Sequence, residues 1–390
     1  MLSGILQKFG LVKVTNDPHT FIAHVPFGGK TLTLIVPVYV DDPLPLGDKR
    51  LMDDFERFLP ETFEVSSTGD VSFFLGLRIC RERGEDRKLR IDQCAFVQTI
   101  LDRFGVPTDS KPVLTPLPAS EDLVPNDAPK EVVVPANRQQ YQSMIGSLMY
   151  LMLGTPPDLA YSVGKLARFS SNPSPHHFCA VDRVLLYLRT TQNFYLEWYP
   201  AGTSIRPYGY TDADYAGDTS DQKSTAGYLF YVGGTAFLWS SKKEPTVTTS
   251  TMEAEYIALY LASQQAAWIF QFYKQIGFPL DKPIHIWYDL QAALNIAKAE
   301  ETHRRAKHLD TQYHSIRERV AEGQTELKWV ASENNSADIL TKSISAGAFS
   351  KHIEAIGLDQ DKASEDDEDD EEEQEVAAHL TPPSGNKSET

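Results

Sequence analysis

The sequence predicts an α/β protein, and two stretches of the chain carry that prediction. Residues 31–40, TLTLIVPVYV, are β-branched and aliphatic, as in a buried strand. From Tyr208 the chain shows three short strands, a long helix, a strand, further helices, a strand and a last helix. The three strands are expected at 208–213, 224–232 and 235–241. With 390 residues and 41% hydrophobic residues, two or three domains are expected.

The N-terminal part predicts mixed α+β structure followed by a linker. Helices are expected at 50–59 and 93–104, with a strand pair at 71–79 and 88–92 between them. Residues 106–137 are rich in proline, which fixes φ and lacks an amide proton, so this segment is expected to be extended. Helical spacing of apolar residues follows at 138–152, 157–169 and 176–190.

The long helix has recognisable ends. Ser250 and Glu253 match the S-x-x-E capping box, and Gly277 with Pro279 predicts a stop near Gln275. Short apolar strands are expected at 284–290 and 326–330. Ser336 is expected to cap a final helix, ADILTKSI.

The charge of the chain is concentrated in its C-terminal tail. Residues 359–390 hold 13 acidic residues and two lysines, so they carry −11 of the net −17 and leave −6 for the rest. Such a like-charge block is expected to be disordered, either as a solubilising tail or as a docking site for a basic partner. Because the body is not basic, nucleic acid would have to be bound through local basic patches or metal ions.

Composition also predicts the compartment. Cys80, Cys94 and Cys179 have neither the density of a disulfide scaffold nor the spacing of a zinc site. The N-terminus lacks the apolar core of a signal peptide, and the longest apolar stretch, SLMYLML, is too short to span a membrane. An intracellular protein of the cytoplasm or nucleus, without a membrane partner, is expected.

Four carboxylates stand at the ends of predicted elements. Asp212 and Asp289 end strands, and Glu255 and Asp338 lie in the first turns of helices. Glu255 lies at helical spacing from Ala258, Leu259 and Ala262, on the expected core-facing stripe, where a lone charge is costly. Singly, each acid is explained by a helix dipole or a turn. Together they indicate a site for a hard cation such as Mg²⁺ or Mn²⁺.

Seven motifs follow one another in the C-terminal half of the chain. They are YTDADYAGD (210–218), KSTAGY (223–228), WSSKKEPTV (239–247), STMEAEYIAL (250–259), YDLQAAL (288–294), KHLDTQYHSIRE (307–318) and ADILTK (337–342). By these motifs, residues 204–346 closely resemble the RNase H domain of the Pol polyproteins of copia-type LTR retrotransposons. Upstream, VYVDD (38–42), FFLGL (73–77), YQSMIGSLMYL (141–151), PDLAYSVGKLARF (157–169) and RVLLYLRTT (183–191) resemble the second half of the reverse transcriptase and its connection to RNase H.

The resemblance implies a domain order and a fold. A truncated reverse-transcriptase palm and thumb would occupy 1–105, the linker 106–137, a helical connection 138–203 and the RNase H-like domain 204–346, before the tail at 359–390. The RNase H-like domain would hold a five-stranded mixed sheet, with three antiparallel strands first and helices on both faces.

The resemblance also implies an activity and its residues. Asp212, Glu255, Asp289 and Asp338 match the four acids that bind two Mg²⁺ or Mn²⁺ ions and hydrolyse the RNA strand of an RNA–DNA hybrid. The loop ASENNS lacks the histidine that assists product release in many RNase H domains, so no residue is assigned that role.

Basic side chains are candidates for phosphate contacts. They are Lys242, Lys243, Arg304, Arg305, Lys307 and His308. A solvated helix face explains HRRAKH (303–308) equally well from the residues alone, and only Lys307 and His308 match the family motif.

The polymerase half departs from the family. Asp41 and Asp42 match two metal-binding acids, but the third comes from an upstream strand, for which a start at Met1 leaves no room. Pro43 and Pro45 follow the turn and are expected to weaken the second hairpin strand. Pro156 and Leu290 also replace the usual Arg and Asn of the family. The metal pair is therefore expected to be vestigial, with polymerase activity only beside a partner chain that supplies the missing acid. An inactive relic, or a co-opted protein that binds nucleic acid or protein, is the alternative to a nuclease.

Overall fold

The computed structural model describes residues 2–61, 69–83, 87–119, 121–129, 134–199, 205–290 and 307–360. The chain divides into two compact units. The first comprises 1–71, 260–286 and 296–328, and the second comprises 72–259, 287–295 and 329–390. No helix in the described part of the chain combines the length and apolar character needed to cross a membrane.

A long antiparallel hairpin dominates the N-terminal part of the first unit. Strand β2 (Thr20–Phe27) pairs along its whole length with residues 30–37 of β3 (Lys30–Tyr39), and β1 (Val12–Lys13) extends the sheet. Helices α1 (Leu2–Lys8) and α2 (Lys49–Phe58) contribute the buried side chains of Leu6, Leu51 and Phe55 to the core beneath it. The predicted strand at 31–40 and helix at 50–59 are thus present.

The turn of the VYVDD motif lies at the end of this hairpin. Val40 adopts a positive φ of 54°, which lets β4 (Asp42–Pro43) fold back on β3. Only two residues pair there, and β5 (Leu46–Gly47) pairs separately with β3. This interruption agrees with the expected effect of Pro43 and Pro45, which cannot donate ladder hydrogen bonds.

A second sheet joins segments that are far apart in the sequence. Its strand order is β15-β9-β8-β7-β6, and all its pairs are antiparallel. The strands are β6 (Phe73–Phe74), β7 (Leu77–Arg81), β8 (Leu89–Asp92), β9 (Phe194–Trp198) and β15 (Leu358–Gln360). Sequence analysis missed β9 and β15. It also placed Asp359 and Gln360 in the tail, which is wrong, because both residues pair with β9; residues 361–390 lie outside the described part.

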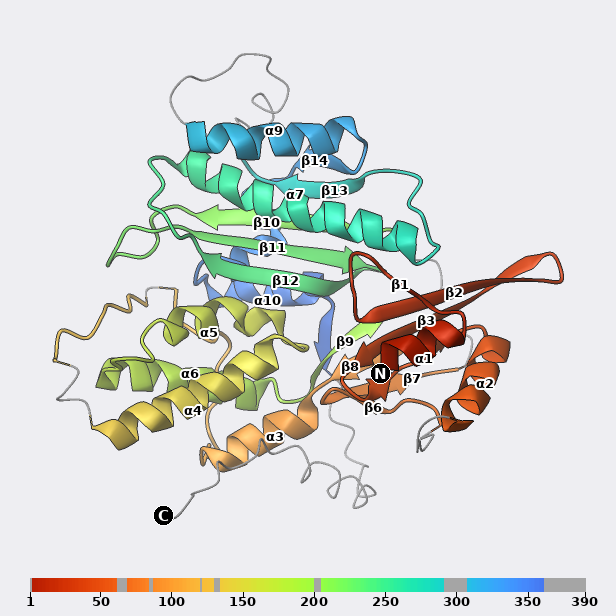
Figure 1. Cartoon of the computed structure of the whole chain (residues 1–390). Helices are drawn as coiled ribbons and strands as arrows, with labels where there is room; N and C mark the ends of the chain where they lie inside the picture. The colour runs from red at the N-terminus through yellow and green to blue at the C-terminus, as the bar shows by residue number, and fades with distance from the viewer. Residues whose placement is uncertain are drawn as a thin grey trace, which may run out of the picture. The chain divides into compact units, whose positions relative to one another are not determined.

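Four helices pack into the main core of the second unit, in the lower left of Figure 1. They are α3 (Cys94–Arg103), α4 (Pro135–Met152), α5 (Ala160–Ala167) and α6 (Pro175–Thr190). The segment expected as one helix at 157–169 begins with the short 3₁₀ turn Pro157–Leu159. Tyr141, Leu148, Val163 and Val184 are fully buried between these helices.

Residues 106–119 and 121–129 of the proline-rich segment form turns and bends without a helix or strand, and they are anchored to these helices. Val113 N donates to Thr190 Oγ1 at 2.9 Å, and Asn172 Nδ2 donates to the carbonyl oxygens of Asn126 and Ala128. Lys165 Nζ likewise donates to the carbonyl oxygen of Glu121 at 3.2 Å. The expected linker is therefore a strap that belongs to the second unit.

The third sheet has the strand order β12-β11-β10-β13-β14. Its strands are β10 (Tyr208–Asp214), β11 (Thr225–Val232), β12 (Thr235–Lys243), β13 (Ile284–Tyr288) and β14 (Thr325–Trp329). β10, β11 and β12 form an antiparallel meander, and the next strand pairs on the far side of β10. This order makes β10 and β13 neighbours in the sheet.

The long helix α7 (Thr251–Gln275) follows β12 along the chain. Its start differs in one detail from the predicted capping box. Ser250 Oγ accepts from Glu253 N at 3.2 Å, as expected, but Glu253 Oε2 accepts from the amide and hydroxyl of Thr249, one residue further back. The apolar stripe of α7 is buried as predicted at Ala258, Leu259 and Ala262.

The C-terminal elements correct the prediction of a last helix capped by Ser336. Ser336–Leu340 form a 3₁₀ helix, η4, and its cap is Asn335, whose side-chain oxygen accepts from Ala337 N. Asn335 Nδ2 also donates to Thr211 O at 3.0 Å, which ties η4 to β10. An α-helix that was not predicted, α10 (Ala346–Ile356), follows.

Candidate metal centre

Asp212 lies in the middle of β10, directly across from Gly227 of β11. It is 1% exposed, and its Oδ2 accepts a hydrogen bond from the Thr341 hydroxyl. Burial raises the pKa of Asp212, while the nearby charge of Lys342 and the Thr341 hydroxyl act in the opposite direction. This carboxylate therefore belongs to a strand, whose backbone is more rigid than that of a loop.

Glu255 reaches the same place from the first turns of α7. It is 7% exposed, and its Oε2 is buried without a hydrogen-bond partner among the described residues. Burial, together with the negative charges of Asp212 and Asp289, raises the pKa of Glu255 well above its ordinary value. A buried carboxylate oxygen without a partner is costly, so this geometry fits a group that binds a proton or a cation.

Asp289 follows the last residue of β13. Its Oδ2 accepts from Ser332 Oγ at 2.7 Å, and its backbone oxygen accepts from Trp329 Nε1 at 3.0 Å. These two bonds hold the side chain and the backbone of the residue. Asp212, Glu255 and Asp289 each place one carboxylate oxygen so that the three atoms lie within 4.8 Å of one another.

Asp338 lies beside this group of three, in η4. Lys342 joins it to Asp212: its Nζ is 3.1 Å from Asp338 Oδ1 and 3.6 Å from Asp212 Oδ2. Burial and then the charge of Asp212 raise the pKa of Asp338. The structure thus brings together all four acids singled out in the sequence, three in direct convergence and the fourth through a lysine.

Sequence reasoning missed three residues that hold these acids, namely Ser332, Thr341 and Lys342. Thr341 and Lys342 belong to the ADILTK motif and lie three and four residues after Asp338, a spacing that signals contact along a helical turn. Although burial by itself lowers the pKa of Lys342, the charges of Asp212 and Asp338 raise it above its ordinary value. Lys342 is therefore a fixed positive charge inside the acidic group.

The donor set fits a hard divalent cation. All three converging atoms are carboxylate oxygens, which suit Mg²⁺ or Mn²⁺ and do not suit zinc. The buried Oε2 of Glu255 is the group that most needs a cation, because no described side chain donates to it.

The two acids of the VYVDD motif have no such surroundings. Asp41 and Asp42 are both exposed at the β3–β4 turn. Within the described residues, the only convergent group of three or more metal-binding side chains is the one at Asp212, Glu255 and Asp289.

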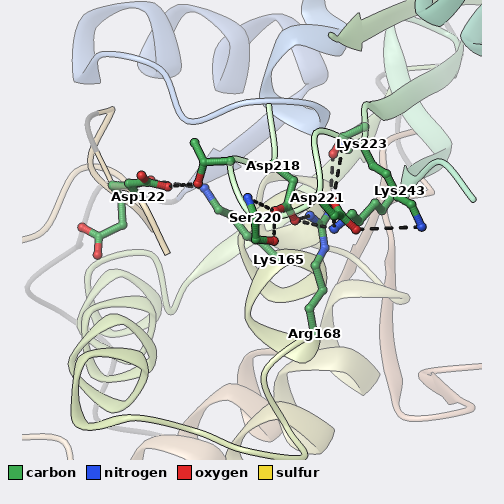
Figure 2. Close-up of polar contacts among 11 residues, drawn as sticks. Asp122, Lys165, Arg168, Asp218, Ser220, Asp221, Lys223 and Lys243 are labelled. Atoms are coloured by element: carbon green, nitrogen blue, oxygen red, sulfur yellow. Dashed lines mark hydrogen bonds and ion pairs between the residues drawn. The ribbon is translucent and has the colours of Figure 1, made fainter. Parts of the chain in front are cut away.

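The basic candidates are placed differently from one another. Lys242 is exposed on β12, as a phosphate contact requires. Lys243 instead forms ion pairs with Asp218 Oδ2 at 2.5 Å and Asp221 Oδ1 at 2.8 Å, as Figure 2 shows. Arg304 and Arg305 lie outside the described residues. Lys307 and His308 begin helix α9 (Lys307–Ala321), and their side chains also lie outside the described part.

A family model described as reverse transcriptase (RNA-dependent DNA polymerase) matches residues 2–119. The Pol polyprotein of the Nicotiana tabacum transposon TNT 1-94 is 37% identical over 83% of this chain, and that of the Arabidopsis thaliana transposon RE1 is 32% identical over 92%. The chain spans about a quarter of the length of these polyproteins, 24% in each case. A putative transposon Ty5-1 protein of Saccharomyces cerevisiae is 30% identical over 66% of this chain and 80% of its own length.

Solved structures of two kinds are also similar. RNase H1 of Halobacterium salinarum matches 35% of this chain and 94% of its own, at 20% identity and a TM-score of 0.27. A foamy viral protease-reverse transcriptase in complex with double-stranded DNA matches 76% of this chain and 46% of its own, at 11% identity and a TM-score of 0.39. With its relatives among transposon proteins and its reverse-transcriptase segment, the chain belongs to the Pol polyproteins of copia-type LTR retrotransposons.

Proposed function

We propose that this chain is a metal-dependent ribonuclease that hydrolyses the RNA strand of RNA–DNA hybrids. The convergence of one oxygen each from Asp212, Glu255 and Asp289 within 4.8 Å supports this proposal most strongly. The active domain would be 204–346, and its metal ligands would be these three residues and Asp338. Two Mg²⁺ or Mn²⁺ ions are proposed for the site.

Three of the proposed ligands are held in place by the chain around them. Asp212 and Glu255 come from a strand and a helix whose backbones are held by regular hydrogen bonding, so their positions are fixed before metal binds. Asp289 is aimed by Ser332. When bound, divalent cations supply a water of lowered pKa and stabilise the charge that develops on the phosphate and leaving oxygens.

The proposed substrate is recognised by its backbone. Lys242, which is exposed on β12, is proposed to contact phosphates. Arg304, Arg305, Lys307 and His308 stay proposed contacts, and their side chains lie outside the described residues. Lys243 is not proposed, because Asp218 and Asp221 already neutralise it. Selection of the RNA strand requires contact with its 2′-hydroxyl groups.

A cleavage assay with matched variants tests the proposal. Purified full-length chain is incubated with a hybrid labelled on the RNA strand, with Mg²⁺ or Mn²⁺ and with EDTA. We expect cleavage of RNA only with metal, and its loss in Asp289→Asn, which removes the charge of one ligand. Asp281→Asn, on an exposed turn before β13, is the control and should cut normally. A hybrid left intact by the parent chain with both metals contradicts the proposal and favours the relic or binding protein.

A polymerase role is a second candidate that the family match over residues 2–119 favours. Asp41 and Asp42 are exposed at a turn, and within the described residues they belong to no convergent group of three metal-binding side chains. Primer extension by this chain on an RNA template measures polymerase activity, and extension would support this role. We expect none from this chain alone.

A further inference from the structure

Lys342 places a positive charge where a metal-binding group of acids needs one. Its Nζ lies 3.1 Å from Asp338 Oδ1 and 3.6 Å from Asp212 Oδ2. The Lys342 side chain is 36% exposed, whereas the side chains of Asp338 and Asp212 are 13% and 2% exposed. The lysine therefore reaches inward from the rim of the site to two acids that lie deeper.

The position of Lys342 is set by the chain around it. It follows Thr341, whose hydroxyl donates both to Asp212 and to the carbonyl oxygen of Asp338. Lys342 N donates to Asp338 O at 3.2 Å, which closes a helical turn. The backbone of Lys342 is thus held in place, and from there its side chain reaches both carboxylates.

We propose that Lys342 is the built-in counter-cation of the acidic centre, and that it competes with divalent metal for Asp212 and Asp338. This inference rests on the proposed function, since it takes those two acids to be metal ligands. In the metal-free protein the ammonium group offsets the mutual repulsion of the acids. A divalent ion that binds the same oxygens has to displace this group or share them with it.

The two remaining acids indicate where metal binds first. Glu255 and Asp289 have no ion pair with Lys342, and Glu255 Oε2 has no donor among the described residues. A first ion is therefore expected on the side of Glu255 and Asp289. A second ion, on the side of Asp338, is the one against which Lys342 competes. Lys342 is a positioning residue in this account, because it acts through the carboxylates.

Two predictions separate this account from a merely structural role. Removing the charge in Lys342→Met should lower the melting temperature in EDTA, because the acids then repel one another without compensation. The same change should strengthen Mg²⁺ and Mn²⁺ binding by about fivefold or more, a typical coupling between two ligands of one site. A lysine that only packs would lower stability without strengthening metal binding.

The experiment is a titration of the full chain with MgCl₂ or MnCl₂, followed by calorimetry and by thermal melting. Lys342→Arg keeps the charge and should keep the weaker metal binding of the parent chain. Lys351→Met is the matched control, because Lys351 Nζ is bonded to Glu333 O and Asn334 Oδ1 and does not touch the acids. Equal or weaker metal binding in Lys342→Met than in the parent overturns the inference.

The cleavage assay is run in parallel on the same proteins, so that the two proposals fail separately. Tighter metal binding in Lys342→Met without hybrid cleavage by the parent chain upholds the counter-cation and refutes the nuclease. Cleavage by the parent with an unchanged metal titration in Lys342→Met upholds the nuclease and refutes the counter-cation. If Lys342→Met does not fold, Lys342→Gln replaces it under the same criteria.

Discussion

Arg168 Nη1 donates to Asp218 Oδ2 at 3.0 Å, and this bond joins the end of helix α5 to the loop between β10 and β11 (Figure 2). Lys243, at the end of β12, binds the same oxygen, and Ser220 binds Oδ1. On the other side of the loop, Thr219 Oγ1 donates to Asp122 of the proline-rich strap at 2.9 Å. One short loop thus connects the strap, the helices and the sheet within the second unit.

Breaking this network is expected to destabilise the second unit. Asp218→Asn would leave Arg168 and Lys243, whose side chains are 21% and 22% exposed, without a charged partner at this oxygen. We expect a loss of about 2–3 kcal/mol in the free energy of unfolding, below the value for fully buried pairs. Urea denaturation measures it. Asp221→Asn removes a more exposed partner of Lys243 and should lower the free energy of unfolding by less. An equal loss in both variants would show that Asp218 is not the centre of the network.

The same network predicts a response to acid. Burial by itself raises the pKa of Asp218, but hydrogen bonds from Lys243 and Ser220 and the charge of Lys243 lower it well below its ordinary value. Its stabilising effect is therefore complete above the pKa of an unfolded aspartate, about 4, and is lost as the pH falls further. The stability difference between parent and Asp218→Asn should shrink in acid. A difference that stays constant from pH 7 to pH 3 would count against this.

Asp158 predicts the opposite pH dependence. It is fully buried, and although the Tyr187 hydroxyl donates to it at 2.5 Å, burial raises its pKa to about 6. Between pH 4 and 6 the folded chain keeps a proton that the unfolded chain has released, so this group's contribution to stability is lost as the pH rises through 6. Asp158→Asn should gain about 2 kcal/mol in the free energy of unfolding relative to the parent between pH 4.5 and 7.5. Melting curves at both pH values check this, with Asp281→Asn, a change at an exposed residue, as the control.

Gly227 is expected to tolerate no side chain. A Cβ there would lie 2.7 Å from Thr341 Cγ2 and 2.8 Å from Leu340 Cβ, and Thr341 is the residue that bonds Asp212. Gly227→Ala should cost about 1–3 kcal/mol and raise the Mg²⁺ concentration needed for half-maximal cleavage. Gly146→Ala is the control, because nothing lies within 4 Å of its added Cβ in helix α4. Unchanged metal dependence in Gly227→Ala would show that Thr341 does not transmit the shift.

Ser332 is expected to affect metal binding and activity only by holding Asp289 in place. Ser332→Ala removes the 2.7 Å hydrogen bond to Asp289 Oδ2, and loss of such a support typically weakens metal binding or activity by about tenfold. Its thermal stability should change little, because Ser332 is exposed. Ser345→Ala, which removes the cap of α10, should show the reverse pattern of lower stability and normal cleavage. Full activity in Ser332→Ala would show that Asp289 needs no such support.

Most regular elements could be predicted from the sequence because their signals are local. Strand β10 and helix α7 lie within a residue or so of the predicted bounds, since alternation, helical spacing and capping depend on neighbours about four residues away. Local signals are less reliable for the exact residue at which a helix begins. Asn335, and not Ser336, caps η4, because its amide is held in place by Thr211 of β10.

The order of the four acids along the chain was visible in the sequence, whereas their partners were not. Residue types and spacing alone named Asp212, Glu255, Asp289 and Asp338. Only the tertiary structure decided that Thr341, 129 positions after Asp212, bonds it, that Lys342 stands between two of the acids, and that Lys243 is neutralised by Asp218. A side chain's charge is local information, but its pairing depends on which distant strands and helices the hydrophobic core brings together, and no short sequence window contains that.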